Sequence, residues 1–242
     1  MDTVEESVGR RDGAALKAMA QDGNAEAAIA FADLVFGAKY GGDLTIHKTK
    51  KAAKDEARED APRLVVQAGE AGSHAALEKA ADMYFMSVWE PGNFGSLILP
   101  ASYKIAMGFY QRLIEAEGLS DEQKALYHCR LGLCYFFRNR VKDSTDPEHR
   151  QMVIDSWEAA RQFPETESAK TATHCLSDLY HREGRYKESF DLAESIADTR
   201  PWAQMTLALA YKHGRGVDQD MDKFQRHYQA FLTMSGSKKK KK

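Results

Sequence analysis

The stretch of sequence that decides the fold reads Ala203-Gln-Met-Thr-Leu-Ala-Leu-Ala-Tyr-Lys-His-Gly-Arg-Gly-Val-Asp-Gln-Asp220. Its first part has the spacing of an amphipathic helix, because four residues recur at i, i+4, i+5 and i+8 and therefore share one helix face. These residues are Ala203, Leu207, Ala208 and Tyr211. Ala208 is small, so this face allows a second helix to approach closely.

Two glycines then predict a turn. Gly214 and Gly216 can adopt a positive φ without steric cost, which suits the end of a helix. Val217 is apolar, and we expect it to fold back onto the core. Asp220 favours the start of a second helix, because a carboxylate is stabilised near the positive end of the helix dipole. The stretch as a whole predicts a helix, a turn and a second helix.

The pattern of the first helix recurs along the chain. It consists of a small residue, a core residue four positions on, a small residue next and an apolar or aromatic residue three further. The five sets are Ala27/Phe31/Ala32/Val35, Ala76/Ala80/Ala81/Tyr84, Tyr127/Leu131/Gly132/Tyr135, Ala172/Leu176/Ser177/Tyr180 and Ala203/Leu207/Ala208/Tyr211. A single helix pair cannot bury its own apolar face, so the recurrence predicts stacked pairs. We expect their first helices to begin near Ala25, Ala75, Glu122, Ser168 and Pro201.

The last of these units resembles the Sel1-like repeat, a relative of the tetratricopeptide repeat. The junctions at residues 20–27 and 68–76 look like the end of a Sel1 unit, with small residues, a glycine and a polar step into the next helix. The first three units depart from the family because their turns lack the G-x-G-V pattern. The fourth unit is instead similar to a tetratricopeptide repeat, with Pro201 expected to stop its second helix. The residues that carry this likeness are Leu176, Tyr180, Gly184, Tyr186 and Pro201.

The resemblance implies an all-α chain, an α-α superhelix or solenoid of about five helix-turn-helix repeats over residues 14–234. Composition agrees, since proline is scarce and the 242 residues, 43% of them apolar, suffice for a sizeable core. We expect one domain, because no linker rich in Pro, Gly or Ser interrupts it. Residues 1–13 are then a lead-in, and residues 235–242 a flexible tail that ends in five lysines.

Charge and composition exclude several classes of function. Without the five terminal lysines, the 34 basic residues fall to 29 against 36 acidic ones, a net charge of −7. A mildly acidic body argues against nucleic-acid binding, which normally requires a basic stripe. No run is long enough for a membrane span, and the acidic N-terminus lacks the features of a secretory signal. Three cysteines, an odd number, favour a reducing cytoplasm. No cofactor motif is present.

The register of the repeats predicts a binding surface. In solenoids of the tetratricopeptide type the first helix of each pair lines the concave face, so the resemblance implies that residues flanking the core pattern contact a protein or extended peptide. An exposed aromatic surface bordered by charge suits such a partner. The alternative is that these aromatic residues only pack against neighbouring helices. The expected contact residues are Asp82, Phe85, Phe136, Phe137, Asp178, Arg182, Trp202, Met205 and Lys212.

The sequence predicts no catalytic residue, because it contains none of the common nucleophile, phosphate-loop or metalloprotease motifs. One cluster offers an alternative of a different class. His174, Asp178 and His181 share one helix face at i, i+4 and i+7, where two imidazoles and a carboxylate suit a divalent metal or a small ligand. Three ligands on one helix reach a tetrahedral geometry poorly, so we expect protein binding and no metal. Such proteins are often scaffolds, adaptors or inhibitors of the immunity type.

Two further segments stand out. The connection at residues 86–100 is long and apolar for a repeat protein, and loops of this length are usually functional or packed on themselves. Its Trp89, Phe94 and Leu97 either cover an edge of the solenoid or form a lip that contacts the partner. Trp157, followed by Ala159 and Ala160, is typical of a buried second helix.

Overall fold

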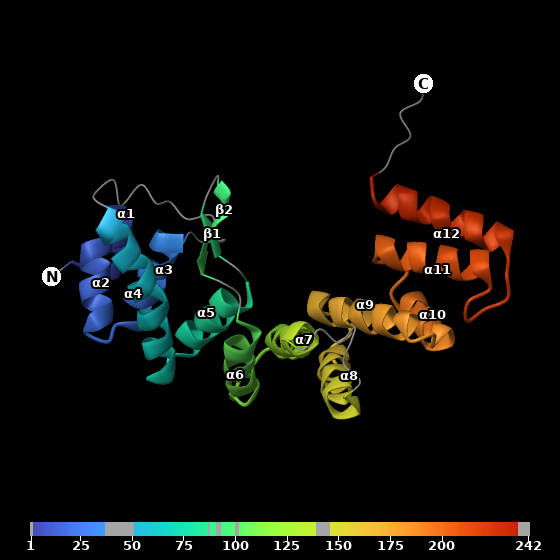
Figure 1. Cartoon of the computed structure of the whole chain (residues 1–242), viewed down its shortest axis with the longest axis horizontal. Helices are drawn as coiled ribbons and strands as arrows, with labels where there is room; N and C mark the ends of the chain where they lie inside the picture. The colour runs from blue at the N-terminus through green and yellow to red at the C-terminus, as the bar shows by residue number, and fades with distance from the viewer. Residues whose placement is uncertain are drawn as a thin grey trace, which may run out of the picture. The chain divides into compact units, whose positions relative to one another are not determined.

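The computed structural model describes residues 2–36, 51–86, 88–90, 93–99, 102–138 and 146–236. Within them it contains twelve helices and a single hairpin of two strands (Figure 1). In chain order these are α1 (Val4–Gly9), α2 (Gly13–Gln21), α3 (Ala25–Phe36), α4 (Lys51–Glu70), α5 (His74–Phe85), β1 (Val88–Glu90), β2 (Asn93–Leu99), α6 (Tyr103–Ile114), α7 (Asp121–Arg138), α8 (Pro147–Arg161), α9 (Glu167–Arg182), α10 (Tyr186–Ser195), α11 (Pro201–His213) and α12 (Met221–Met234).

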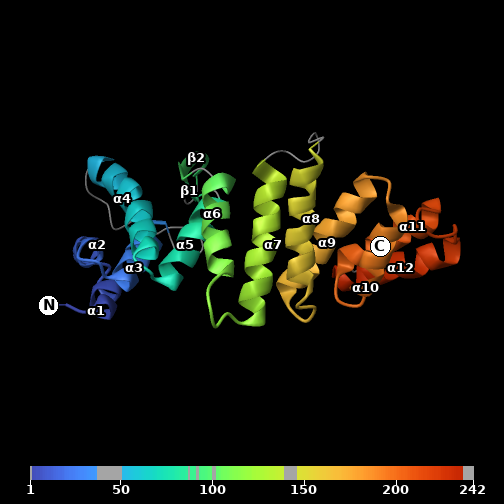
Figure 2. The ribbon, with the colours of Figure 1, turned by 90° about the horizontal axis from the view of Figure 1, so that it is seen from below.

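The helices group into two compact units that share α7. One unit comprises Met1–Glu117 and Leu133–Thr145, and the other comprises Gly118–Gly132 and Asp146–Lys242. In the first unit α3, α4, α5 and α6 each pack against the next helix of the chain (Figure 2). In the second unit the same order holds from α8 to α12. Each unit is therefore a run of helices stacked in sequence order, the arrangement of an α-solenoid. The single domain expected over residues 14–234 remains a prediction.

The predicted helix starts are confirmed. Helices α3 and α11 begin at Ala25 and Pro201, and α5, α7 and α9 each begin one residue before the expected position. Side-chain caps explain these boundaries, because the first N–H groups of a helix have no partner within it. The Oγ of Ser73 accepts a hydrogen bond from the N–H of Ala76 at 3.3 Å, and the Oγ1 of Thr166 accepts one from the N–H of Ala169 at 3.1 Å.

The small residues of the repeated pattern lie where helices meet. Ala32, Ala81 and Ala208 are fully buried, and Gly132 and Ser177 are also buried. Gly132 illustrates why size matters at these positions. A Cβ atom there would lie 2.4 Å from the Nε1 of Trp157, which is itself buried and donates a hydrogen bond to the carbonyl of Cys129 at 3.2 Å. Trp157 is thus a core residue, as the sequence predicted.

The hairpin of α11 and α12 confirms the helix, glycine turn and second helix that the sequence predicts. Gly214 ends α11 in the left-handed conformation at φ 63°, and Gly216 follows at φ 75°. Val217 packs against the core of the second unit, together with Phe190, Leu207 and Tyr211. The carboxylate of Asp220 caps α12 and accepts hydrogen bonds from the first two free N–H groups at 3.0 and 2.9 Å. These contacts lower the pKa of Asp220.

The structure differs from the sequence-based expectations at three places. The lead-in at residues 1–13 contains a helix, α1, which a capping box between Thr3 and Glu6 starts. The apolar connection after α5 pairs as strands β1 and β2, with Val88 opposite Leu99, because its β-branched and aromatic residues favour extended backbone. Pro201 does not stop α10, which ends at Ser195, but begins α11, where its missing N–H costs nothing. The five terminal lysines lie outside the described residues.

Candidate binding pocket

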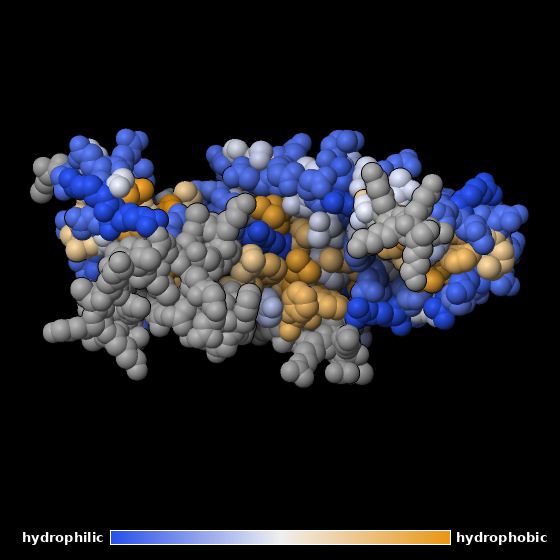
Figure 3. All heavy atoms as spheres, turned by 90° about the horizontal axis from the view of Figure 1, so that it is seen from above, coloured by the Kyte–Doolittle hydropathy of each residue, from blue (hydrophilic) through white to orange (hydrophobic). Residues whose placement is uncertain are grey.

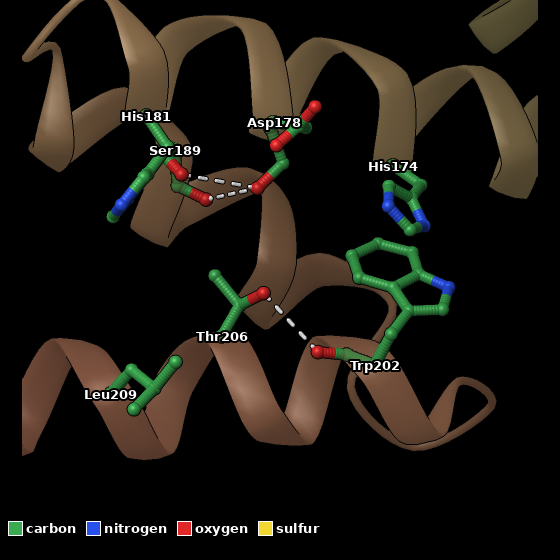
Figure 4. Close-up of a pocket in the computed structure, with 8 residues that line it drawn as sticks. His174, Asp178, His181, Ser189, Trp202, Thr206 and Leu209 are labelled. Carbon is green, nitrogen blue, oxygen red and sulfur yellow. Dashed lines mark hydrogen bonds between the residues drawn. The ribbon is translucent and has the colours of Figure 1, made fainter.

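A pocket of about 210 Å³ lies in the second unit between α9 and α11 (Figure 4). Helix α9 supplies His174, Asp178 and His181, the three residues predicted to share one face. Helix α11 supplies Trp202, Thr206 and Leu209, which also lie at i, i+4 and i+7. Two first helices of successive hairpins thus present one side-chain row each to the same cavity. Ser177 of α9 and Ser189 of α10 complete the lining.

The pocket is built around a network of hydroxyl groups. The Oγ of Ser177 donates a hydrogen bond to the carbonyl of Ser189 at 2.9 Å, so the hydroxyl of Ser189 donates to the Oγ of Ser177 at 3.1 Å. Both serines are buried. Across the pocket, the Oγ1 of Thr206 donates to the carbonyl of Trp202 at 3.1 Å. All three hydroxyl protons are therefore used within the protein, and none is available to a ligand.

One end of the pocket is formed by two rings in close contact. The imidazole of His174 and the indole of Trp202 have their centroids 3.7 Å apart, and their planes are tilted by 40° (Figure 4). Burial lowers the pKa of His174, although the nearby carboxylate of Asp178 acts in the opposite direction. His174 is therefore neutral at pH 7, and this end of the pocket is largely apolar.

The polar groups at the middle and the other end have partners on the protein surface. A carboxylate oxygen of Asp178, Oδ2, pairs with the guanidinium of Arg182 at 2.6 Å, and both side chains are nearly half exposed. The guanidinium of Arg215 lies 3.4 Å from the Nε2 of His181. The ring of His181 also contacts Tyr186.

The alternative site centred on His174, Asp178 and His181 remains a prediction, and its three side chains line the same pocket. Among the described residues, no group of three or more His, Cys, Asp or Glu side chains is placed to hold a metal ion. Each of the three side chains instead faces a different neighbour. The adjacent thiol offers no nucleophile, because burial raises the pKa of Cys175 to about 12, as it does that of Cys129.

A second cluster, in the first unit, contains the predicted residues of the aromatic half. The ring of Phe85 meets the rings of Tyr103 and Tyr110 edge-on at about 6 Å, and Tyr103 stacks on Phe137 at 5.4 Å. Phe136 contacts Phe137 edge-on at 5.4 Å. Asp82 accepts a hydrogen bond from the hydroxyl of Tyr110 at 2.8 Å. Phe85 and Phe137 thus pack against α6, and the predicted role of these residues in binding remains a prediction.

Two residues of this unit also leave apolar surface open. The side chain of Phe137 is 47% exposed and that of Ile105, on α6, is 43% exposed. In Figure 3, apolar side chains gather in the middle of the displayed face, at the position of α7 in Figure 1. The aromatic cluster therefore has a packed interior and an exposed edge.

Of the five predicted contact residues in the second unit, only Asp178 and Trp202 line the α9–α11 pocket, and three lie outside it. Met205 and Lys212 point elsewhere on α11, and the ammonium of Lys212 lies 5.5 Å from the centre of the Phe224 ring of α12. Arg182 borders the pocket only through its ion pair with Asp178. Thr206 and Leu209 were not predicted as site residues. They lie about one and two helical turns after Trp202 on the same face of α11, so helical periodicity was the signal that could have found them.

The fold and the pocket define the chain as a helical-repeat protein of the α-solenoid class. Among solved structures, the chain is similar to a Sel1 repeat protein from Oxalobacter formigenes, at 16% sequence identity and a TM-score of 0.48. The match covers 97% of this chain and 60% of that one, so this chain spans less than two thirds of its length. No protein-family model and no curated protein matches the sequence. No described helix is long and apolar enough to cross a membrane.

Proposed function

We propose that the chain binds another protein and that an extended segment of this partner lies in the pocket between α9 and α11. The observation that carries this proposal is the pairing of Trp202 with an exposed apolar neighbour, Leu209, on the rim of a cavity. Large apolar side chains beside a hollow are the common anchors of protein interfaces. The chain would then act as a scaffold, an adaptor or an inhibitor in the cytoplasm.

The size of the pocket favours this role over catalysis or small-ligand binding. A cavity of about 210 Å³ holds one long side chain. Pockets for small molecules and cofactors usually measure about 300–1,000 Å³. The hydrogen bonds of the pocket also argue against nucleophilic catalysis. The hydroxyl of Ser177 bonds to the carbonyl and hydroxyl of Ser189, and neither serine is hydrogen-bonded to a histidine that could act as a base.

The exposed edge of the aromatic cluster offers a second contact surface on the first unit. Phe137 and Ile105 are held by neighbouring helices and still present apolar area to solvent. Rigid aromatic residues lose little conformational entropy on binding, which makes them efficient contacts.

Affinity capture with mass spectrometry identifies the partner, and two matched variants then test the pocket. Leu209→Ala removes an apolar side chain that is 42% exposed on the pocket rim. Met152→Ala removes one that is 43% exposed on α8, away from the pocket. We expect Leu209→Ala to weaken the complex and Met152→Ala to leave it unchanged. Equal effects of the two substitutions would refute the placement of the site.

Deletion of residues 238–242 is a further control. The lysine run carries five positive charges, and attraction between charges across solvent is screened at physiological salt. We expect the truncated protein to bind the captured partner with nearly unchanged affinity. A loss confined to this deletion would replace the pocket by electrostatic attachment through the tail.

A further inference from the structure

The pocket between α9 and α11 contains a hydrogen-bond acceptor that can still receive a donor, the carboxylate of Asp178. The hydroxyl protons of Ser177, Ser189 and Thr206 are used within the protein. The imidazole of His174 is neutral, so it has one donor and one acceptor nitrogen. Asp178 uses Oδ2 for Arg182, and within the described residues no other hydrogen bond or ion pair reaches its carboxylate. Asp178 is therefore an acceptor with room for a donor.

Charge points in the same direction. Of the eight lining residues, Asp178 is the only one with a carboxylate, and no lysine or arginine is among them. Its partner Arg182 is an exposed side chain one turn along the same helix, and exposed i,i+4 ion pairs contribute little to stability. A second cation can therefore join or replace Arg182 at small cost. Without the terminal lysines the chain carries a net charge of −7, which attracts basic partners over a distance.

The apolar lining fits the stem of a long basic side chain. Trp202 and Leu209 lie on α11 opposite Asp178, so a ligand between the helices touches both kinds of surface (Figure 4). Lysine and arginine bury their methylene stems on apolar surface while the charged head finds an acceptor. An aromatic face beside the head adds a cation–π attraction. Arg215 borders the His181 end, so a cation meets less repulsion nearer the rings of His174 and Trp202.

We propose that the pocket between α9 and α11 binds a lysine or arginine side chain carried by an extended basic segment of the partner. This inference rests on the proposed function and names the chemistry of the segment. The stem lies against Trp202 and Leu209, and the charged head donates to the carboxylate of Asp178.

Short peptides of glycine, serine and alanine test this with the full chain. Each carries one central residue, which is arginine, lysine, citrulline, norleucine or glutamate. The readout is the indole N–H resonance of Trp202, assigned by its loss in Trp202→Phe. We expect saturable shifts with arginine and lysine, and binding at least about tenfold weaker with citrulline and norleucine, which lack the charge. Equal binding of arginine and citrulline, or tighter binding of glutamate, would overturn the proposal.

Two variants of the ion pair sharpen the test. Asp178→Asn removes the acceptor charge, and we expect it to weaken arginine binding by about tenfold or more. Arg182→Gln removes the internal competitor, and we expect affinity to stay the same or to rise. The matched control is Asp191→Asn, which removes the carboxylate of an exposed i,i+4 pair with Lys187 on α10. The reverse result, a loss with Arg182→Gln and none with Asp178→Asn, would show that the pocket takes an acidic group.

The outcomes separate this inference from the proposed function. If the captured partner depends on Leu209 but no basic peptide moves the Trp202 resonance, the chemistry of the segment is wrong and the binding site stands. If the captured partner is indifferent to Leu209, the binding site itself is wrong, and the inference falls with it.

Discussion

The contact between Gly132 and Trp157 gives the sharpest prediction about the fold. A Cβ atom at Gly132 would lie 2.4 Å from the Nε1 and 2.5 Å from the Cδ1 of Trp157. Such an approach cannot occur without movement, and the indole ring is buried and hydrogen-bonded to the carbonyl of Cys129. Gly132→Ala must therefore push the ring away from α7.

The magnitude follows from three contributions. Overpacking a core costs about 1–3 kcal/mol. Loss of the indole hydrogen bond costs about 0.5–1.5 kcal/mol. Alanine has a higher helix propensity than glycine, which returns about 1 kcal/mol. We expect Gly132→Ala to lower the free energy of unfolding by about 0.5–3.5 kcal/mol, which for a domain of this size corresponds to a fall in Tm of roughly 1–14 °C.

Gly108 provides the matched control. It lies inside α6, and a Cβ atom there would meet nothing within 4 Å. Gly108→Ala should therefore show the propensity gain alone and stabilise the protein by about 0.5–1 kcal/mol. Thermal and urea unfolding, followed by circular dichroism and tryptophan fluorescence, measure both variants. If Gly132→Ala were as stable as Gly108→Ala, the packing of α7 on α8 described here would be refuted.

Three further predictions concern stability. Ala208→Leu overpacks a fully buried helix contact, so thermal unfolding should show a loss of about 1–3 kcal/mol, and an unchanged Tm would contradict the repeat register. Asp220→Ala removes the side-chain cap of α12 and should lower the free energy of unfolding by about 1 kcal/mol in urea unfolding. Asp222→Ala removes a negative charge from the first turn of α12 but leaves the cap in place, so it should lower the free energy of unfolding less. Burial lowers the pKa values of His128, His174 and His227, so the unfolded chain binds more protons below its histidine pKa of about 6.5. Stability should accordingly fall as the pH drops from about 7.5 to about 5, and a flat profile in urea unfolding would show that these rings are not buried as neutral groups.

The helix pairs could be predicted from sequence because their signals are local. Small residues at helix contacts, glycines at turns and caps such as Ser73, Thr166 and Asp220 all act within a few positions of themselves. The capping box of Thr3 and Glu6 was an equally local signal for α1 that the sequence analysis passed over. Strands β1 and β2 were harder to foresee, because an apolar run between two helices fits a packed loop as well as a hairpin.

The binding pocket could be predicted only in part. The α9 face with His174, Asp178 and His181 followed from helical spacing. Which face of α11 opposes it did not, since that depends on how α11 and α12 pack together. The hydrogen bond between His227 of α12 and Gln204 of α11, at 2.8 Å, marks the side of α11 that faces α12. With α11 rotated about its axis in this way, Leu209 lines the pocket and Met205 does not. The pairing of Arg182 with Asp178 likewise needed the structure, because either side chain alone reads as a free contact.

The dissociation constant of the captured partner for Trp202→Ala tests the central claim most directly. Trp202 forms one wall of the pocket, and its partly buried ring also packs against the core of the second unit. We predict that the variant keeps the circular dichroism spectrum of the native protein with a lower Tm, while its complex weakens by about 2 kcal/mol, roughly thirtyfold in Kd, at a temperature where the variant is folded. An unchanged Kd in a folded variant would contradict the claim that the chain holds its partner in the pocket between α9 and α11.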